Sequence, residues 1–412
     1  MASSEITLEA VPSATDIPAA DWDACANPPG DPTSLENLDT LAATGAQSDA
    51  CRPAYNPFVS HAFFAAAEAS GSACARTGWG PRHLLARLDG KIAGIVPCYL
   101  KSHSQGEYVF DRGWADAYER AGGRYYPKLQ ASVPFTPATG PRLLIRDGVD
   151  REQIGTALVS GLMALCNATN ASSVHVTFAR EAEAKFLGDH GFLQRNDQQF
   201  HWHNAGYGSF DDFLTSLNSR HRKAIKRERR EATAAGITIH HLTGSDITED
   251  AWDAFFAFYM ETGSRKWGRP YLTRKFFSLI GESMSRDVLL VMAKRNGRWI
   301  AGAINFIGSD TLFGRNWGAV EHHPFLHFEV CYYQAIDFAI QRGLRVVEAG
   351  AQGEHKLARG YLPQTTWSAH YIADPDLRRA IADYLKRERA YVAEVGRELT
   401  DAGPFRKADD EA

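Results

Sequence analysis

The stretch that decides the fold is Val288-Leu-Leu-Val-Met-Ala-Lys-Arg-Asn-Gly-Arg-Trp-Ile-Ala-Gly-Ala-Ile-Asn-Phe306. It contains two apolar runs that are separated by the dipeptide Asn296-Gly297. Both central positions of a tight two-residue turn favour positive φ, which Asn and Gly adopt at little cost. The stretch therefore predicts a β-hairpin.

The same pattern occurs in the first half of the chain, where Asp89-Gly-Lys-Ile-Ala-Gly94 parallels Asn296-Gly-Arg-Trp-Ile-Ala-Gly302. Each hairpin is followed by an expected helix and then by a short apolar strand. These pairs cover 151–165 with 173–178, and 328–341 with 344–349. The repetition predicts a duplicated mixed α/β domain, in which each copy has a twisted sheet flanked by helices. The alternative is a chance likeness between two common hairpins.

A chain of 412 residues fits about two domains. We expect them at 1–205 and 206–400, followed by a frayed acidic tail at 401–412. Residues 28–54 are rich in Pro, Gly and Asp and predict a long surface loop within the first domain. A basic helix at 218–234, capped by Asn218 or Ser219, links the two domains.

The composition excludes several classes of protein. Hydrophobic residues make up 44% of the chain, which is typical of a globular protein. The formal net charge of −4 gives no general reason to expect DNA binding. The N-terminal residues lack the pattern of a secretory signal, and the apolar runs are too short to cross a bilayer. Six scattered cysteines predict reduced thiols, so we expect a cytoplasmic protein.

The segment from Phe313 to Tyr333 carries many groups suited to chemistry, at an expected strand-to-helix junction. Side chains at such a junction point into the crevice where α/β folds bind ligands. His327 and Glu329 are candidate catalytic bases for an amine nucleophile. Metal binding by these residues with His322 and His323 is an alternative, although the spacing matches no established metal pattern, and we expect no metal site. Glu329 is alternatively a first-turn carboxylate that the helix dipole favours.

A second segment, Glu348-Ala-Gly-Ala-Gln-Gly-Glu-His-Lys-Leu-Ala-Arg-Gly-Tyr-Leu-Pro363, leaves an expected buried strand through a glycine-rich turn. Glycine allows close approach of a ligand, and Lys and Arg suit phosphate. His355 is a third candidate base, and Lys356 and Arg359 are candidate ligands of a phosphate group. A tight turn with solvated charges is the alternative.

Two further groups of side chains are less specific. Arg220, Arg222 and Lys223 open the basic helix and either bind donor phosphate at its N-terminus or form a solvated face. A substrate groove is predicted from aromatic and acidic residues, with packing of a loop onto the core as the alternative for its first-half members. The groove residues are Trp114, Tyr118, Tyr126, Trp317 and Glu354.

Several of these segments resemble one known family, the FemAB-like acyltransferases of Gram-negative bacteria. The resemblance covers about residues 55–400, and 28–54 looks like an insertion. The matching segments are Tyr125-Tyr-Pro-Lys-Leu-Gln130, Val133-Pro-Phe-Thr-Pro137, Gln199-Phe-His-Trp-His-Asn204, Arg220-His-Arg-Lys-Ala-Ile-Lys-Arg-Glu-Arg229, Lys266-Trp-Gly-Arg-Pro-Tyr-Leu-Thr273, Leu326-His-Phe-Glu-Val-Cys-Tyr-Tyr333 and the segment 348–361.

The resemblance implies two tandem GNAT-like domains and transfer of an acyl or aminoacyl group to an amine without a metal. Within this family, the preferred reaction is N-acylation of a sphingoid base such as 3-oxosphinganine by a fatty acyl thioester, as in bacterial ceramide synthases. This implies a lipid substrate, acyl-CoA or an acyl carrier protein thioester as co-substrate, no bound cofactor, and peripheral contact with the inner membrane. The first alternative is a FemX-like transferase that uses aminoacyl-tRNA and a peptidoglycan precursor. The second is a lipid- or cell-wall-binding module without activity.

One departure from ordinary GNAT enzymes concerns the grip on the donor. These enzymes hold the pyrophosphate of acyl-CoA with a glycine-rich loop that enters a helix. The matching junction here, Glu321-His-His-Pro-Phe-Leu-His327, contains no glycine. A CoA donor is therefore expected to depend on basic side chains, namely Arg315, Lys356, Arg359 or the cluster at 220–223.

Overall fold

A computed structural model describes residues 5–28, 55–267, 270–350 and 353–406, except for the side chains of 264–267 and 354. The chain forms two compact units. Unit 1 comprises 1–29, 58–197 and 365–394, and unit 2 comprises 30–57, 198–364 and 395–412. These bounds differ from a single division at 205, because a C-terminal segment returns to the N-terminal unit. The predicted loop at 28–54 and the last residues of the predicted tail lie outside the described residues.

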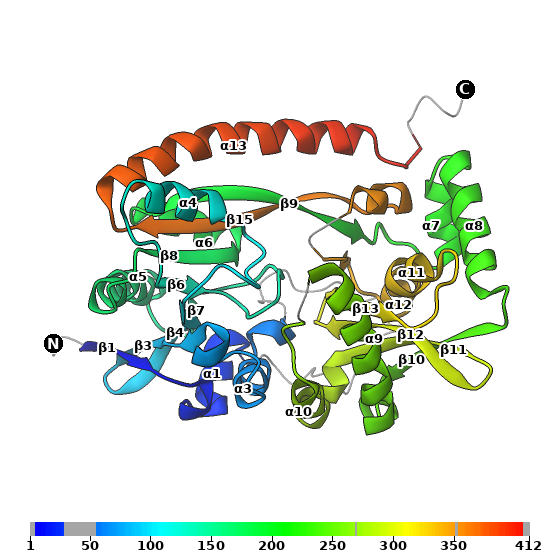
Figure 1. The fold of residues 1–412 in the computed structure, drawn as a ribbon, viewed down its shortest axis with the longest axis horizontal. Helices are drawn as coiled ribbons and strands as arrows, with labels where there is room; N and C mark the ends of the chain where they lie inside the picture. Colours follow the sequence, from blue (N-terminus) through cyan, green and yellow to red (C-terminus); the bar gives the residue numbers. More distant parts are fainter. Residues whose placement is uncertain (1–4, 29–54, 268–269, 351–352, 407–412) are drawn as a thin grey trace. The chain divides into compact units, whose positions relative to one another are not determined.

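Unit 1 contains two sheets and the helices that cover them (Figure 1). Sheet A has the strand order β1-β3-β4-β7, and every pairing in it is antiparallel. The other strands of the unit follow the order β15-β8-β6-β5-β2, in which β6 and β8 are parallel. The strands are β1 (Ile6–Val11), β2 (Trp79–Pro81), β3 (His83–Leu88), β4 (Lys91–Val96), β5 (Cys98–Lys101), β6 (Lys128–Ala131), β7 (Leu144–Ile145), β8 (Ser173–Ala179) and β15 (Leu362–Ile372). The helices are α1 (Ala19–Ala26), α3 (His61–Ala69), α4 (Arg112–Arg120), α5 (Arg151–Ala168), α6 (Glu181–Asp189) and α13 (Pro375–Asp401).

The core of unit 1 forms where α5 packs against sheet A. Ile154 and Leu158 of α5 are fully buried and belong to one apolar cluster with Leu84 and Val96 of the sheet. Gly94 of β4 lies directly below the helix, since an added Cβ would approach Ile154 to 2.8 Å. Burial of a large aliphatic side chain contributes about 1.5–3 kcal/mol, so this contact is a main source of stability in unit 1.

In the described part of unit 2 the strands follow the order β10-β11-β12-β13-β14-β9 (Figure 1). Among these strands β13 and β14 are parallel, and the other neighbours are antiparallel. The strands are β9 (Leu193–His203), β10 (Ile237–Thr243), β11 (Val288–Arg295), β12 (Arg298–Ile307), β13 (Thr311–Ala319) and β14 (Val346–Glu348). The α-helices are α7 (Phe210–Ser216), α8 (Ser219–Thr233), α9 (Glu249–Trp267), α10 (Arg274–Met284), α11 (Leu326–Phe328) and α12 (Gln334–Gln341). A π-helix, η7 (Glu329–Tyr333), joins α11 to α12, and a 3-10 helix, η8 (Glu354–Arg359), follows β14.

Helices cover both faces of this sheet. Leu289, Val291 and Ala293 of β11 pack in one cluster with residues of α8, η7 and α12. On the other face α9 packs closely against β13, because an added Cβ on Gly318 would approach the carbonyl oxygen of Phe258 to 2.0 Å. Burial on both faces explains why β11 reads as a continuous apolar run rather than an alternating one.

The mixed α/β fold class is confirmed. The two hairpins are present, and each is followed by the expected helix and short strand. Asp89 and Gly90 have φ of 49° and 82°, and Asn296 and Gly297 have φ of 50° and 76°. Asn218 caps α8 by accepting a hydrogen bond from the backbone N–H of His221. The helix expected at 328–341 begins instead at Leu326 and includes the π-helix.

The structure bears on two general expectations, which concern the cysteines and membrane-spanning helices. The cysteines at 25, 74, 98, 166 and 331, which lie in the described part of the chain, are all free thiols. Among the described residues, no helix is both long and apolar enough to cross a membrane.

Candidate functional site

Strands β13 and β14 run together for only three residue pairs. Their parallel register joins Thr311 with Val346 and ends where Phe313 pairs with Glu348. Gly314 follows, and an added Cβ there would lie 3.3 Å from the carbonyl oxygen of Glu348. Beyond this point β14 ends, and Gly350 adopts a φ of 76° as the chain leaves the sheet.

The remaining half of β13 pairs with β12 alone in the described part of the chain, for example through Trp317 and Ala303. No strand among the described residues pairs with the other edge of this half of β13. An extended ligand that adds to such an edge gains main-chain hydrogen bonds. The end of β13 is thus a natural place for an elongated substrate.

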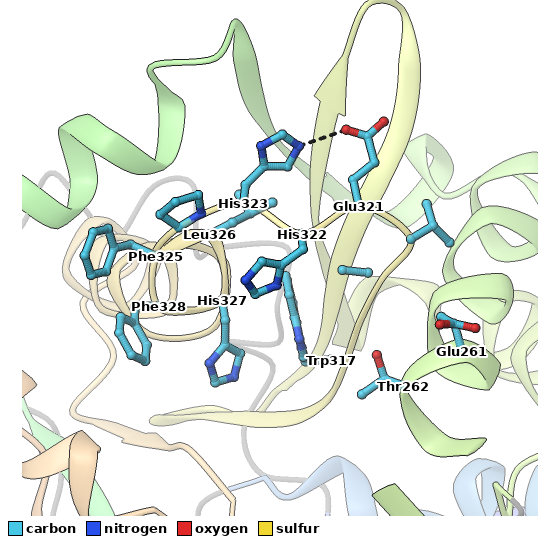
Figure 2. Close-up of a pocket in the computed structure, with 13 residues that line it drawn as sticks. Glu261, Thr262, Trp317, Glu321, His322, His323, Phe325, Leu326, His327 and Phe328 are labelled. Carbon is cyan, nitrogen blue, oxygen red and sulfur yellow. Dashed lines mark hydrogen bonds and ion pairs between the residues drawn. The ribbon is translucent and has the colours of Figure 1, made fainter. Parts of the chain in front are cut away.

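A cavity of about 490 Å³ lies in unit 2 beside this end of β13 (Figure 2). This volume is within the range of small-molecule sites, roughly 300–1,000 Å³. The end of α9, the loop after β13 and the start of α11 form its walls. The lining residues are Glu261, Thr262, Trp317, Ala319, Val320, Glu321, His322, His323, Pro324, Phe325, Leu326, His327 and Phe328.

Two of the predicted site residues, Trp317 and His327, line this cavity, and their rings lie 5.3 Å apart between centroids. The neighbouring histidine His323 forms a 2.8 Å contact with Glu321, which also pairs with Arg295 at 3.2 Å. Figure 2 shows the contact between His323 and Glu321. No group of three or more His, Cys, Asp or Glu side chains is arranged to hold a metal ion within the described residues.

His355 and Tyr332 form a pair next to His327. The hydroxyl of Tyr332 and Nε2 of His355 are 2.9 Å apart. The His327 ring lies 5.3 Å from that of Tyr332 and 6.1 Å from that of His355. Burial raises the pKa of Tyr332 well above its ordinary value, so the phenol keeps its proton. The His355 side chain itself is exposed, which leaves it accessible to a substrate.

Lys356 is the buried cation of the site, with only 2% of its surface exposed. Its Nζ donates a hydrogen bond to the carbonyl oxygen of Gly350 at 2.8 Å. The pKa of Lys356 is lowered to about 8, chiefly by burial; Cys331 opposes this shift and the charge of Arg315 adds to it. A lysine poised this close to neutrality is typical of functional sites.

Glu329, a predicted base, is engaged in the structure by other side chains. It is 2% exposed. Arg229 contacts both of its oxygens at 3.0–3.3 Å, and Gln334 donates to Oε1 at 2.6 Å. A carboxylate held in this way stabilises the junction of α8 with η7 and is poorly placed to accept a proton. The alternative structural role fits this geometry better than catalysis.

Arg359 is likewise committed within unit 2. Its Nη2 contacts both carboxylate oxygens of Glu228 at 3.0 and 2.9 Å, and its guanidinium lies 3.5 Å from the centroid of Phe328. Tyr333 also donates a hydrogen bond to Glu228. Because buried ion pairs are costly to break, the pairing with Glu228 holds Arg359 in place, and its role as a phosphate ligand stays a prediction.

The other predicted site residues lie in several places. Arg220 and Lys223 are exposed on α8, and Arg222 donates to the carbonyl oxygen of Leu217 at 3.4 Å. The side chain of Glu354 lies outside the described residues. Arg315 lies on β13, just beyond the point where β14 ends.

The aromatic residues predicted as a groove in the first half lie in unit 1. Trp114 of α4 is 8% exposed and belongs to an apolar cluster with Ile372 and Leu385, against which the partly buried Tyr118 and Tyr126 pack. Their role in a groove stays a prediction. Trp317 is the predicted groove residue that lines the cavity of unit 2.

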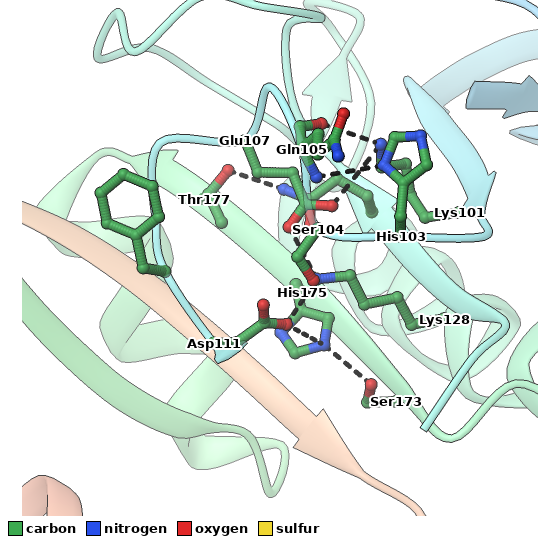
Figure 3. A network of polar contacts seen from close by, with 12 residues as sticks. Lys101, His103, Ser104, Gln105, Glu107, Asp111, Lys128, Ser173, His175 and Thr177 are labelled. Carbon is green, nitrogen blue, oxygen red and sulfur yellow. Dashed lines mark hydrogen bonds and ion pairs between the residues drawn. The ribbon is translucent and has the colours of Figure 1, made fainter. Parts of the chain in front are cut away.

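Unit 1 contains a buried charge cluster that the sequence analysis missed. It consists of Lys101, Glu107, Asp111 and Lys128 (Figure 3). Lys128 donates to Glu107 at 2.6 Å, to Ser104 at 2.7 Å and to Asp111. Lys101 donates to the carbonyl oxygen of residue 105 at 3.1 Å and lies 3.6 Å from Glu107.

The pKa values of the two lysines of the cluster are shifted in opposite directions. Burial lowers the pKa of Lys101 to about 7. Burial acts against the charge of Lys128 as well, but the carboxylates of Glu107 and Asp111 outweigh it and raise its pKa above the ordinary value. A lysine inside an apolar β-strand, as in Tyr125-Tyr-Pro-Lys-Leu-Gln130, is the sequence signal that points to this cluster.

A cavity at the end of two diverging strands, with a buried lysine and a His–Tyr pair nearby, is typical of an α/β enzyme that handles a small substrate. The chain matches the FemAB-like family, described as peptidoglycan biosynthesis/recognition, over residues 13–407. It belongs to the FemAB-like family.

Three solved structures are similar to this chain at low sequence identity. FemX is 12% identical with a TM-score of 0.49, and the match covers 76% of this chain and 93% of FemX. A tandem GNAT protein from the clavulanic acid biosynthesis pathway is 13% identical with a TM-score of 0.45, covering 90% and 99%. L-PGS from Bacillus licheniformis is 8% identical with a TM-score of 0.45, covering 71% and 86%. No curated protein matches the chain.

Proposed function

We propose that this protein is an N-acyltransferase, which moves an acyl group from an activated carrier to an amine at the cavity of unit 2. The observation that carries the proposal is the position of Lys356 and the His355–Tyr332 pair beyond the point where β13 and β14 part. His327 links them to the cavity, since it lines the cavity and its ring lies 6.1 Å from that of His355.

The proposed reaction is direct attack by the amine on the carbonyl carbon of the donor. His355 accepts a proton from the amine as the new C–N bond forms. The carbonyl oxygen becomes an oxyanion, which the Lys356 ammonium stabilises. The bond to the leaving group then breaks, and the leaving thiol or hydroxyl takes a proton from the protonated His355. The products are an amide and the free carrier.

For the acyl chain and the acceptor, the lining of the cavity favours an apolar substrate. Trp317, Phe325 and Phe328 contribute aromatic walls, and Val320 and Met260 are exposed large apolar side chains at or next to the lining. A fatty acyl thioester and a long-chain amine, such as 3-oxosphinganine, fit this lining. The membership in a family described by peptidoglycan biosynthesis/recognition favours a second candidate, an aminoacyl donor with a peptidoglycan-type amine.

The test offers both donors to one preparation. Purified protein is incubated with palmitoyl-CoA and 3-oxosphinganine, and separately with aminoacyl-tRNA and a peptidoglycan precursor, and amide products are measured by mass spectrometry. Amide formation that is lost in His355→Ala and Lys356→Met, and kept in the exposed control Lys275→Met, supports N-acyl transfer at this site. Absence of an amide from both donors with folded protein overturns the proposal.

A further inference from the structure

Helix α8 has two faces of opposite character. Ile225, Glu228 and Ala232 are buried, and their spacing of three and four residues places them on the inner face. Arg220, Lys223, Arg227 and Arg230 are exposed, with a spacing of three, four and three residues, and form the outer face. We call these four side chains the basic face.

Most of the basic face has no acidic partner among the residues that the structure describes. Arg227 lies 3.9 Å from Glu231, and the pair is mostly exposed. Arg220, Lys223 and Arg230 form no ion pair within the described residues. Like charges at these spacings destabilise a helix by a few tenths of a kcal/mol per pair. Folding of α8 therefore does not require this arrangement, and an external anion would relieve it.

The helix is firmly attached to the proposed active site. Its N-terminal turn lies against η8, where His221 contacts the backbone of Ala358. The same 3-10 helix carries His355 and Lys356. A macromolecule on the basic face therefore has a short path to the site through the N-terminal end of α8.

We propose that the basic face is the docking surface for an acidic protein that carries the acyl group as a thioester. The inference rests on the proposed N-acyl transfer and names its donor. A helix of 15 residues is about 22 Å long, which matches one acidic helix of a partner protein. Docking brings the thioester arm to η8 and makes or breaks no covalent bond.

Two observations favour a protein over an RNA as the partner. No Phe, Tyr or Trp occurs in α8 on which a base would stack. Asp211 is exposed 3.3 Å from Lys226 of α8, where it would repel a continuous phosphate backbone. A helix-sized acidic patch meets the basic face without needing the surroundings to be basic.

The first experiment measures binding by itself. Purified full-length protein is titrated with palmitoyl-loaded acyl carrier protein at two salt concentrations, alongside the variant R220E/K223E/R230E. The control K275E/R286E/R298E changes charge equally at exposed sites on other elements of unit 2. We expect salt-sensitive binding, weakened at least about tenfold in the α8 variant and within twofold of wild type in the control. No binding, or equal binding by both variants, overturns the inference.

The second experiment separates this inference from the proposed function. N-acylation is measured with palmitoyl-carrier protein, with the small donor S-palmitoyl-N-acetylcysteamine, and with aminoacyl-tRNA. We expect the α8 variant to lower the preference for the carrier over the small donor by about tenfold or more. A preference that stays constant, while the small donor is used, refutes the docking surface and leaves N-acyl transfer intact. Transfer from aminoacyl-tRNA alone, weakened by the α8 variant, assigns the face to RNA and overturns the inference. No amide from any donor refutes the proposed function, and the binding result then decides the docking surface.

Discussion

Arg359 Nη2 donates hydrogen bonds to the two carboxylate oxygens of Glu228 at 3.0 and 2.9 Å. Its Nη1 donates to the carbonyl oxygen of His355 at 2.6 Å. The ion pair therefore joins α8 to the backbone that carries the proposed base. Both partners are buried, so the loss of either one leaves an unpaired buried charge.

Removal of one partner of this pair should destabilise the protein and displace His355. We expect Glu228→Met or Arg359→Met to cost about 3–5 kcal/mol of unfolding free energy, since each leaves a buried charge unpaired. The double variant should cost less than the sum of the two. Urea unfolding checks this, and the exposed pair Lys185–Glu181 is the control. Additive losses would show that the two side chains act independently.

Lys356 should set an alkaline limb in the pH profile of the reaction. Its pKa is lowered to about 8, so the ammonium that stabilises the oxyanion is lost as the pH rises through that value, and kcat should fall. Arginine stays protonated, so Lys356→Arg should keep activity and lose this limb, while Lys356→Met should lower kcat about 10²–10³-fold. The control is the exposed substitution Lys275→Arg. An unchanged alkaline limb in Lys356→Arg would assign it to another group.

The hydrogen bond between Tyr332 and His355 should contribute to catalysis by orienting the imidazole. His355→Ala should lower kcat by at least about 10²-fold, the usual contribution of a positioned base. Tyr332→Phe should lower it by about 2–10-fold, which corresponds to one hydrogen bond of 0.5–1.5 kcal/mol. Steady-state kinetics separates the two effects, with Tyr207→Phe as the control. A larger loss in Tyr332→Phe than in His355→Ala would make the phenol the principal group.

Glu329 should matter for stability more than for turnover. Because Arg229 and Gln334 engage its carboxylate, Glu329→Gln should lower the melting temperature, while kcat per folded molecule stays within about threefold of wild type. Circular dichroism and kinetics on the same preparation test this. A loss of 10²-fold or more in kcat, without loss of folded protein, would restore Glu329 as the base.

Substitution of the two buried lysines of unit 1 by methionine should have very different effects on stability. Lys128→Met leaves Glu107 and Asp111 without their main cation and should cost about 3–5 kcal/mol. Lys101→Met removes an ammonium that burial disfavours and should cost little. The lowered pKa of Lys101 means that the unfolded chain binds an extra proton between about pH 7 and 10, so this lysine contributes more stability as the pH rises. The unfolding free energy of the wild type should therefore rise relative to that of Lys101→Met over that range. Chemical denaturation measures this, with Lys91→Met as the control.

The sequence was most informative where local chemistry decides the structure. The turns at Asp89-Gly90 and Asn296-Gly297, and the cap at Asn218, follow from backbone preferences of single residues and are confirmed. The FemAB-like family was also predicted from motifs and is confirmed. His327 and Trp317 were expected at a strand-to-helix junction, which is where the cavity lies.

The remainder depends on contacts between distant residues. Glu329 and Arg359 looked like free site residues, because their partners Arg229 and Glu228 lie about 100 or more positions away. The π-helix at Glu329–Tyr333 follows from packing that no local pattern shows. The charges of unit 1 were missed since their burial depends on a loop folding over the strands that carry Lys101 and Lys128.

The return of residues 365–394 to unit 1 has a consequence for synthesis on the ribosome. His370 and Glu388 supply contacts to His175 and Arg195, so this unit lacks part of its interior until residues 365–394 have been made. At about 5–20 residues per second, that delay is on the order of half a minute. Unit 2 is in the same position, because its core contacts Leu399 and Phe405, which are made after 365–394. Neither unit is therefore complete until residue 394 has been made, and the usual order of N-terminal domain before C-terminal domain does not apply to this protein.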